Sequence, residues 1–168
     1  MTQSRNQVIY AASGEAARNK KSIFLAGSIS HDDSHNWRNV LTTSLSDLSI
    51  TIYNPHRPDW DSSWDEDIEY TPFREQVEWE LEKQEVADII VVYFHPATKA
   101  PISLLELGLC ARVPGKALVV CPPGYWKRGN VQVVCKRFGM QMVESNDELK
   151  RVLAVKLGLS ASCNVAQD

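Results

Sequence analysis

The segment from Ile89 to Phe94, IIVVYF, is a run of apolar and aromatic residues without a charged interruption. A strand of this composition is buried on both faces, which is typical of parallel sheets covered by helices on either side. The segments on both sides, 73–87 and 101–112, have the length and composition of helices. The run therefore favours an α/β fold over an all-α or all-β fold.

The same alternation of strand and helix continues along the chain. Further strands are predicted at 22–27, 49–55, 116–121 and 140–143, and further helices at 34–48, shortly before 140, and at 146–159. This order predicts α/β architecture with a single-domain open parallel sheet of about five strands, a flavodoxin- or Rossmann-like three-layer sandwich. We expect the domain to span 22–159, with a polar N-terminal arm at 1–21 and a flexible tail at 160–168.

Composition narrows the possible functions. The net charge is −3 and no basic block occurs, which argues against a nucleic-acid partner. No apolar run reaches membrane-spanning length and the N-terminus lacks the apolar core of a signal peptide, so we expect no membrane partner and a cytoplasmic location. The four cysteines form no CxxC pair, which argues against a zinc site or a disulfide framework. Neither GxxxxGK[ST] nor GxGxxG is present, which argues against a Walker-type NTPase and a dinucleotide-dependent oxidoreductase.

One polar cluster, HDDSH at 31–35, has two interpretations. It could bind a metal, or it could be a solvated loop in which Asp32, Asp33 or Ser34 caps the following helix. The second interpretation is favoured, because metal ligands usually recur at helical or turn spacing. We therefore predict no metal site.

Ligands of open parallel sheets bind beyond the carboxyl ends of the strands. In this chain those ends lead into loops that contain GSIS, NPHRPDW, HPATKAPIS and PPGYWKRGN. Asn54, directly after the second predicted strand, is therefore a candidate substrate-binding residue, and Arg57, Lys99 and Lys127 are candidates for holding a phosphate. The second loop is long, acidic and aromatic, and its Trp60 and Trp64 could stack on a base or act as a hydrophobic plug.

Glu80 is an acidic residue on the apolar side of its predicted helix. At 100° per residue, Phe73, Val77 and Leu81 share one face, and Glu80 falls within that stripe. It could bend outward or pair with an arginine as a structural ion pair, or it could face a functional site.

Glu106 lies within the apolar run PISLLELGLCA, where an unpaired carboxylate is costly to bury. One interpretation is a capping box, with Ser103 as the N-cap residue and Glu106 reaching back to its N–H. The other is functional: a carboxylate in the first turn of a helix is kept ionised by the helix dipole, at the edge of the sheet where a ligand binds. Paired carboxylates are what cleavage of a glycosidic bond requires, one of them charged and the other carrying the proton because its apolar surroundings raise its pKa.

Three segments together, SIFLAGSI, EWELEKQEVADIIVVYF and LLELGLCA, resemble the nucleoside 2-deoxyribosyltransferase superfamily, which includes 2'-deoxynucleoside 5'-phosphate N-hydrolases. The similarity extends from about Ser22 to Gly139. Its most specific part runs from Ala87-Asp88 through the strand and loop to Glu106-Leu107-Gly108 and on to Ala111.

The resemblance implies roles for individual residues. Glu106 would be the nucleophile that attacks C1' and forms a glycosyl-enzyme intermediate, and Glu80 would bind the sugar or help to protonate the departing base. Gly27 and Ser28 would contact the sugar or a phosphate. Asn130 would reach into the site of a neighbouring subunit, which implies a homo-oligomer acting on a small-molecule nucleoside or nucleotide without a cofactor.

The sequence departs from the family pattern six residues before Glu106. The family usually has an aspartate or serine there to recognise a sugar hydroxyl or a 5'-phosphate, and this chain has Ala100. Two functions therefore stay open from sequence: transfer or hydrolysis at the N-glycosidic bond, and a non-catalytic nucleotide- or metabolite-binding module on the same fold.

Overall fold

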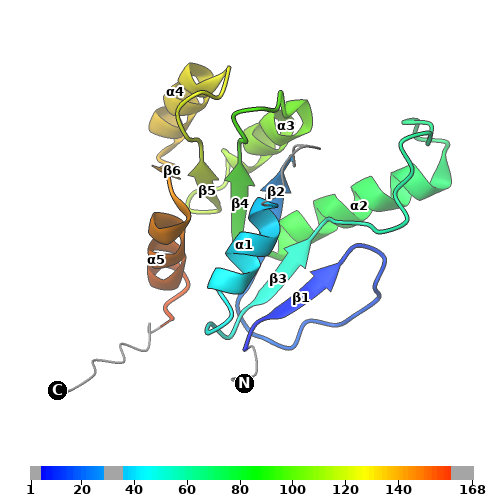
Figure 1. Ribbon diagram of the computed structural model, residues 1–168, viewed down its shortest axis with the longest axis horizontal. Helices are drawn as coiled ribbons and strands as arrows, with labels where there is room; N and C mark the ends of the chain where they lie inside the picture. Colours follow the sequence, from blue (N-terminus) through cyan, green and yellow to red (C-terminus); the bar gives the residue numbers. More distant parts are fainter. Residues whose placement is uncertain (1–4, 29–35, 160–168) are drawn as a thin grey trace.

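A computed structural model describes residues 5–28 and 36–159 of the chain. The strands are β1 (Gln7–Tyr10), β2 (Ser22–Gly27), β3 (Thr51–Asn54), β4 (Ile89–Tyr93), β5 (Ala117–Val120) and β6 (Gln141–Val143). The helices are α1 (Trp37–Ser44), α2 (Thr71–Val86), α3 (Pro101–Cys110), α4 (Arg128–Phe138) and α5 (Asn146–Lys156). The strands form one parallel sheet in the order β1-β3-β2-β4-β5-β6, so the predicted α/β class is confirmed (Figure 1).

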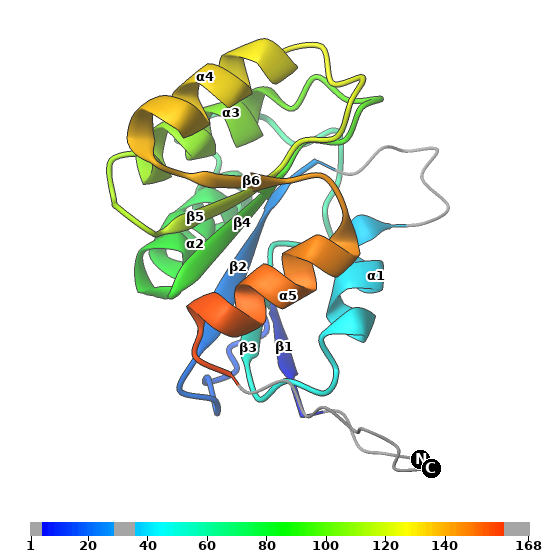
Figure 2. The same ribbon diagram turned by 90° about the vertical axis from the view of Figure 1, so that its left-hand side faces the viewer.

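Helices cover both faces of the sheet. The helices α2, α3 and α4 lie on one face, and α1 and α5 lie on the other (Figure 2). Alternate residues of the central strands enter the two cores: Ile90 and Val92 of β4 face the first group of helices, while Val91 faces the second. Burial of strands on both sides explains why IIVVYF contains no charged residue.

The sheet has six strands where about five were predicted. The additional strand, β1, lies in the segment expected to be a polar arm and pairs in parallel with β3, Gln7 opposite Thr51. The side-chain Oε1 of Gln7 accepts a hydrogen bond from the N–H of Arg18 at 2.8 Å, which fixes the loop that leads to β2. A four-residue strand at the edge of a sheet is too short to stand out in the sequence.

The helix after β2 begins with a different cap from the one expected. The N-cap residue of α1 is Asn36, whose side chain accepts a hydrogen bond from the N–H of Arg38, so the prediction of Asp32, Asp33 or Ser34 as the cap was wrong. Asn is as good an N-cap as Asp or Ser, and it lies directly before the first apolar residue of the helix. The HDDSH cluster and the tail at 160–168 lie outside the described residues.

The order of strands creates a topological switch point between β2 and β4. The chain leaves β2 through α1 toward β3, whereas it leaves β4 through α3 toward β5, in the opposite direction across the sheet. The two connections therefore diverge and open a crevice at the carboxyl ends of these neighbouring strands. A ligand site is expected there.

Candidate functional site

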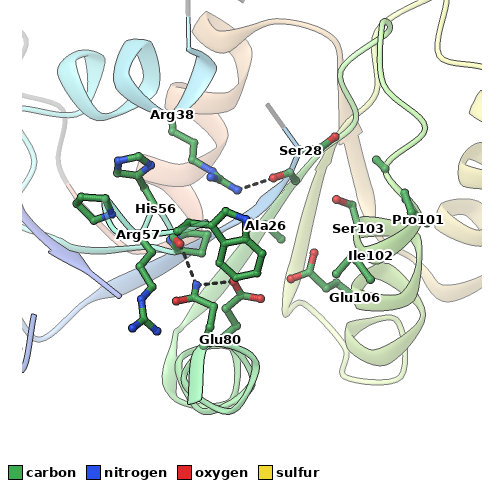
Figure 3. Close-up of a pocket in the computed structure, with 16 residues that line it drawn as sticks. Ala26, Ser28, Arg38, His56, Arg57, Glu80, Pro101, Ile102, Ser103 and Glu106 are labelled. Atoms are coloured by element: carbon green, nitrogen blue, oxygen red, sulfur yellow. Dashed lines mark hydrogen bonds between the residues drawn. The ribbon is translucent and has the colours of Figure 1, made fainter. Parts of the chain in front are cut away.

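A cavity of about 690 Å³ opens at this switch point (Figure 3). Its lining comes from the end of β2, from α1, from the loop after β3, from α2 and from the start of α3. The residues are Ala26, Gly27, Ser28, Arg38, Pro55, His56, Arg57, Pro58, Trp60, Gln76, Glu80, Ala100, Pro101, Ile102, Ser103 and Glu106. The structure therefore brings together four of the six residues predicted from the sequence to be catalytic or to contact the sugar or a neighbouring site: Glu106, Glu80, Gly27 and Ser28, but not Asn54 or Asn130.

Glu106 is held in the cavity wall by a neighbouring helix. It is 7% exposed, and its Oε1 accepts a hydrogen bond of 2.8 Å from Nε2 of Gln84 on α2. The capping-box interpretation is wrong, because α3 begins at Pro101 after the N-cap residue Ala100, which has a φ of 49°. Glu106 thus lies in the second turn of the helix, beyond reach of the cap.

Glu80 faces the same cavity from α2, but for a different reason from the one predicted. Val77 and Leu81, expected to form an inward apolar stripe with it, are 36% and 42% exposed. The part of α2 next to the cavity is instead polar: Gln76 and Gln84, one turn before and one turn after Glu80, are buried, while Trp79 packs against the core. Nε2 of Gln76 donates a hydrogen bond of 2.8 Å to Oε1 of Glu80 and one of 3.0 Å to the carbonyl of Pro55. The side of α2 next to the cavity is lined for a polar ligand.

Arg38 of α1 supplies the cationic group of the site. It is 9% exposed, and its Nη2 donates a hydrogen bond to the carbonyl oxygen of Gly27 (Figure 3). Burial lowers the pKa of its guanidinium to about 10, although the charges of Glu80 and Glu106 oppose that shift. Arg38 is therefore still charged at neutral pH, and its Nε has no hydrogen-bond partner among the described residues.

The two carboxyl groups share this environment. Burial raises the pKa of Glu106 to about 7, with a further contribution from the charge of Glu80, against the opposing effects of Arg38 and of the hydrogen bond from Gln84. The pKa of Glu80 is also raised, by burial, against the hydrogen bond from Gln76 and the charge of Arg38. The expectation that a helix terminus keeps Glu106 ionised was wrong, because the dipole acts within the first turn and Glu106 lies in the second.

Gly27 and Ser28 form the wall of the cavity at the end of β2. Gly27 has a φ of 131°, and a Cβ there would collide with the carbonyl oxygen of Tyr93 on the neighbouring strand, so a side chain is excluded. Ser28 Oγ donates a hydrogen bond of 2.7 Å to Oγ1 of Thr98 in the loop before α3. This bond ties the loops after β2 and β4 together across the switch point.

The other two candidates do not line the cavity. Asn54 is buried at the end of β3, where its Oδ1 accepts a hydrogen bond of 3.0 Å from the N–H of His56 and shapes the following turn. Asn130 is exposed on α4, so its role toward a neighbouring subunit stays a prediction. Of the proposed phosphate ligands, Arg57 lines the cavity, whereas Lys99 and Lys127 do not.

The long loop after β3 places an aromatic cluster at the cavity. Trp60 lines the cavity and is 43% exposed, and its ring centroid lies 5.1 Å from that of Trp64 and 6.4 Å from that of Phe73. The guanidinium of Arg57 lies 4.9 Å from the Trp64 ring and also pairs with Asp59. Trp60 thus presents an aromatic surface to the cavity, supported from behind by its neighbours.

Sequence reasoning missed Arg38 and the two glutamines. Arg38 is three and seven residues before Leu41 and Leu45, which are both fully buried, so its spacing placed it on the inward face of α1. Gln76 and Gln84 are four residues before and after Glu80, a spacing that puts all three on one face. These spacings were visible in the sequence, but the chemistry of the site was not.

Comparison with known proteins identifies the family of the chain. Residues 20–125 match the family described as "Nucleoside 2-deoxyribosyltransferase like". The chain belongs to this family. The matched segment contains the whole lining of the cavity, from Ala26 to Glu106. No functionally curated protein matches the chain.

A solved structure with a similar fold is that of a conserved protein from Enterococcus faecalis V583. The two chains are 14% identical and superpose with a TM-score of 0.58, over 82% of this chain and 99% of the other. This similarity supports the fold. Within the part of the chain that the structure describes, no helix is both long and apolar enough to cross a membrane.

Proposed function

We propose that this member of the nucleoside deoxyribosyltransferase-like family cleaves or transfers at the N-glycosidic bond of a nucleoside or its 5'-monophosphate. The observation that carries the proposal is a pair of carboxyl groups, those of buried Glu106 and half-buried Glu80, that face one cavity from neighbouring helices. The positive charge of Arg38 acts against the rise in pKa of both carboxyl groups and so favours their ionised forms. Two carboxyl groups on one cavity suit a double displacement at an anomeric carbon.

In the proposed reaction, an ionised oxygen of Glu106 attacks C1' as the bond from C1' to the base nitrogen breaks. The base leaves with a proton supplied by Glu80 or by water, and the sugar remains as an ester of Glu106. Water or a second base then attacks C1', loses a proton and releases the carboxylate of Glu106. Attack by water makes the protein a hydrolase, and attack by a second base makes it a transferase.

A second candidate function is a binding module without chemistry, and Ala100 is the observation that favours it. Ala100 lies in the cavity wall where the family usually carries a residue that recognises a hydroxyl or a phosphate. A protein of this kind would bind nucleosides or nucleotides without releasing base.

The experiment that separates the two candidates is chromatography of the base released from a panel of deoxynucleosides, ribonucleosides and their 5'-monophosphates. Each substrate is incubated with the full chain, with and without a second base. Release of base supports the enzyme, and appearance of a new nucleoside identifies transfer. Binding by calorimetry without base release from any substrate would instead support the binding module.

The pKa of Glu106 predicts how activity depends on pH. A nucleophile with a pKa of about 7 is protonated on acidification, so kcat/KM for base release is expected to be constant above about pH 8 and to fall roughly tenfold per pH unit below 7. The measurement is kcat/KM from pH 5 to 9. A rate that stays constant down to pH 5 would contradict a raised pKa for a nucleophilic Glu106.

Trp60 is expected to bind the base. Stacking of a base on an aromatic side chain is worth about 1–3 kcal/mol, so Trp60→Ala is expected to raise KM roughly tenfold with little change in kcat. Trp126→Ala is the matched control, because Trp126 is exposed and does not line the cavity. Equal KM values for wild type and Trp60→Ala would favour the hydrophobic-plug interpretation of this loop.

A homo-oligomer in which Asn130 completes a neighbouring site is also part of this proposal. It is supported by the exposure of Asn130 on α4 and by an apolar stripe on α3, where Ile102, Leu105 and Leu109 are each more than half exposed. Isolated apolar residues on a surface are ordinary, but three at helical spacing form a continuous strip.

A further inference from the structure

The hydrogen bond between Gln84 and Glu106 joins two helices inside the site. Gln84 lies in the last turn of α2 and Glu106 in the second turn of α3, and each is 7% exposed. The bond of 2.8 Å is between Nε2 of Gln84 and Oε1 of Glu106. A buried amide that donates to a carboxylate makes a charge-assisted bond, which is stronger and more directional than a bond between neutral groups.

We propose that Gln84 is a positioning residue for Glu106, whose amide holds Oε1 so that Oε2 is directed into the cavity for attack. Among the described residues, it is Gln84 that donates a hydrogen bond to this carboxylate. Figure 3 shows the Glu106 side chain directed into the cavity, toward the side occupied by Glu80. A carboxylate held through one oxygen keeps the other free for the sugar, which is the geometry that a nucleophile needs.

The face of α2 is built for this arrangement. Gln76, Glu80 and Gln84 succeed one another at intervals of four residues, and the first glutamine holds Glu80 while the second holds Glu106. A helix that packs beside a sheet would normally present apolar residues there. An amide at position 84 gains a partner in Glu106, whereas a leucine there would leave the carboxylate without its donor.

Gln84 acts on Glu106 together with titratable groups on three helices, of which Glu80 and Arg38 are charged and Cys110 is a neutral thiol. Glu80 of α2 raises the pKa of Glu106, Arg38 of α1 lowers it, and the thiol of Cys110 lies one turn further along α3. The hydrogen bond from Gln84 favours the ionised form. Removal of the donor is therefore expected to make Glu106 harder to ionise, with the other charged groups left in place.

The test is a titration of the Glu106 carboxyl carbon by NMR in the full chain, with side-chain carboxyl-labelled glutamate and with Glu106→Gln to assign the signal. Gln84→Met keeps the volume of the side chain and removes the amide, and it is expected to move the midpoint up by about one pH unit. Gln132→Met, on the exposed face of α4, is the matched control and is expected to leave the midpoint unchanged. An unchanged midpoint in folded Gln84→Met would overturn the proposal and reduce Gln84 to a tether between helices.

Gln84→Asn keeps the amide but withdraws it by one methylene group, and it serves if the Met variant does not fold. The same shift of midpoint is expected, and no shift overturns the proposal. The kinetic role rests on the proposed function. The kcat of Gln84→Met is expected to fall roughly tenfold at unchanged KM, and the acid limb of its pH–rate profile is expected to move by the same amount as the titration midpoint of Glu106. If wild type releases no base while the titration still shifts, the proposed function fails and the contact of Gln84 with Glu106 stands.

Discussion

Glu106→Gln is expected to lower the rate of base release by at least about a thousandfold, while the protein remains folded. The substitution keeps the size of the side chain and can keep the hydrogen bond with Gln84, but a neutral amide oxygen cannot form the glycosyl ester. Base release and circular dichroism are measured side by side on wild type and variant. Glu85→Gln removes an exposed carboxylate from the neighbouring helix and is expected to retain full activity.

A second measurement locates the intermediate. Mass spectrometry of acid-quenched wild type during turnover is expected to find the sugar on the peptide that contains Glu106, and to find none in the variant. Retention of base release by folded Glu106→Gln would exclude this residue as the nucleophile. The remaining carboxylate of the pair, Glu80, would then be the next candidate.

The arrangement of the sheet followed from local patterns. The unbroken apolar run of β4, together with helices on both sides of it, fixes a doubly covered parallel sheet, and this prediction was confirmed. The edge strand β1 was missed because its four residues, QVIY, acquire their role from pairing with β3. A partner so distant in sequence leaves no local signal.

The sequence identified both candidate carboxylates, but the local structures predicted around them differ from those observed. Glu106 stood out as an acid in an apolar run, yet its cap role depended on where α3 begins, and Pro101 moves that start earlier than Ser103 would. Glu80 was placed inward by an apolar stripe, yet Val77 and Leu81 of that stripe are exposed to solvent. A helix beside a cavity departs from the usual rule, because part of its inward side meets a polar site and only the rest, through Trp79, meets the core.

Arg38 and Gln84 could not be assigned roles before the fold was known. Their functional neighbours come from other helices: Arg38 of α1 acts on Glu80 and Glu106, and Gln84 of α2 contacts Glu106 of α3. Spacing shows that such residues face inward, but it does not show what they meet there. Only the tertiary structure shows these contacts.

The second large effect concerns stability. Glu106→Gln is expected to raise the free energy of unfolding at pH 8 by up to roughly 3 kcal/mol, and to change it little at pH 4. The sign follows from the pKa of Glu106, which rises from an ordinary value of 4.5 to about 7 in the folded chain. The folded state binds the proton more tightly than the unfolded state, so wild type loses stability as the pH rises from 4.5 to 7. Above pH 7 the loss is complete and stays constant.

In Glu106→Gln, residue 106 contributes no pH dependence to stability, because its amide carries no charge to bury at any pH. Chemical denaturation of wild type and Glu106→Gln at pH 4, 6 and 8 measures the difference in their free energies of unfolding. This difference is expected to grow between pH 4.5 and 7. Glu85→Gln is expected to leave the curve of wild type unchanged, since its carboxylate is in water in both states. A difference that is the same at all three pH values would show that Glu106 titrates normally in the folded chain. A buried carboxylate kept at the expense of stability is expected at a functional site, where the charge is needed for the reaction and the fold must tolerate it.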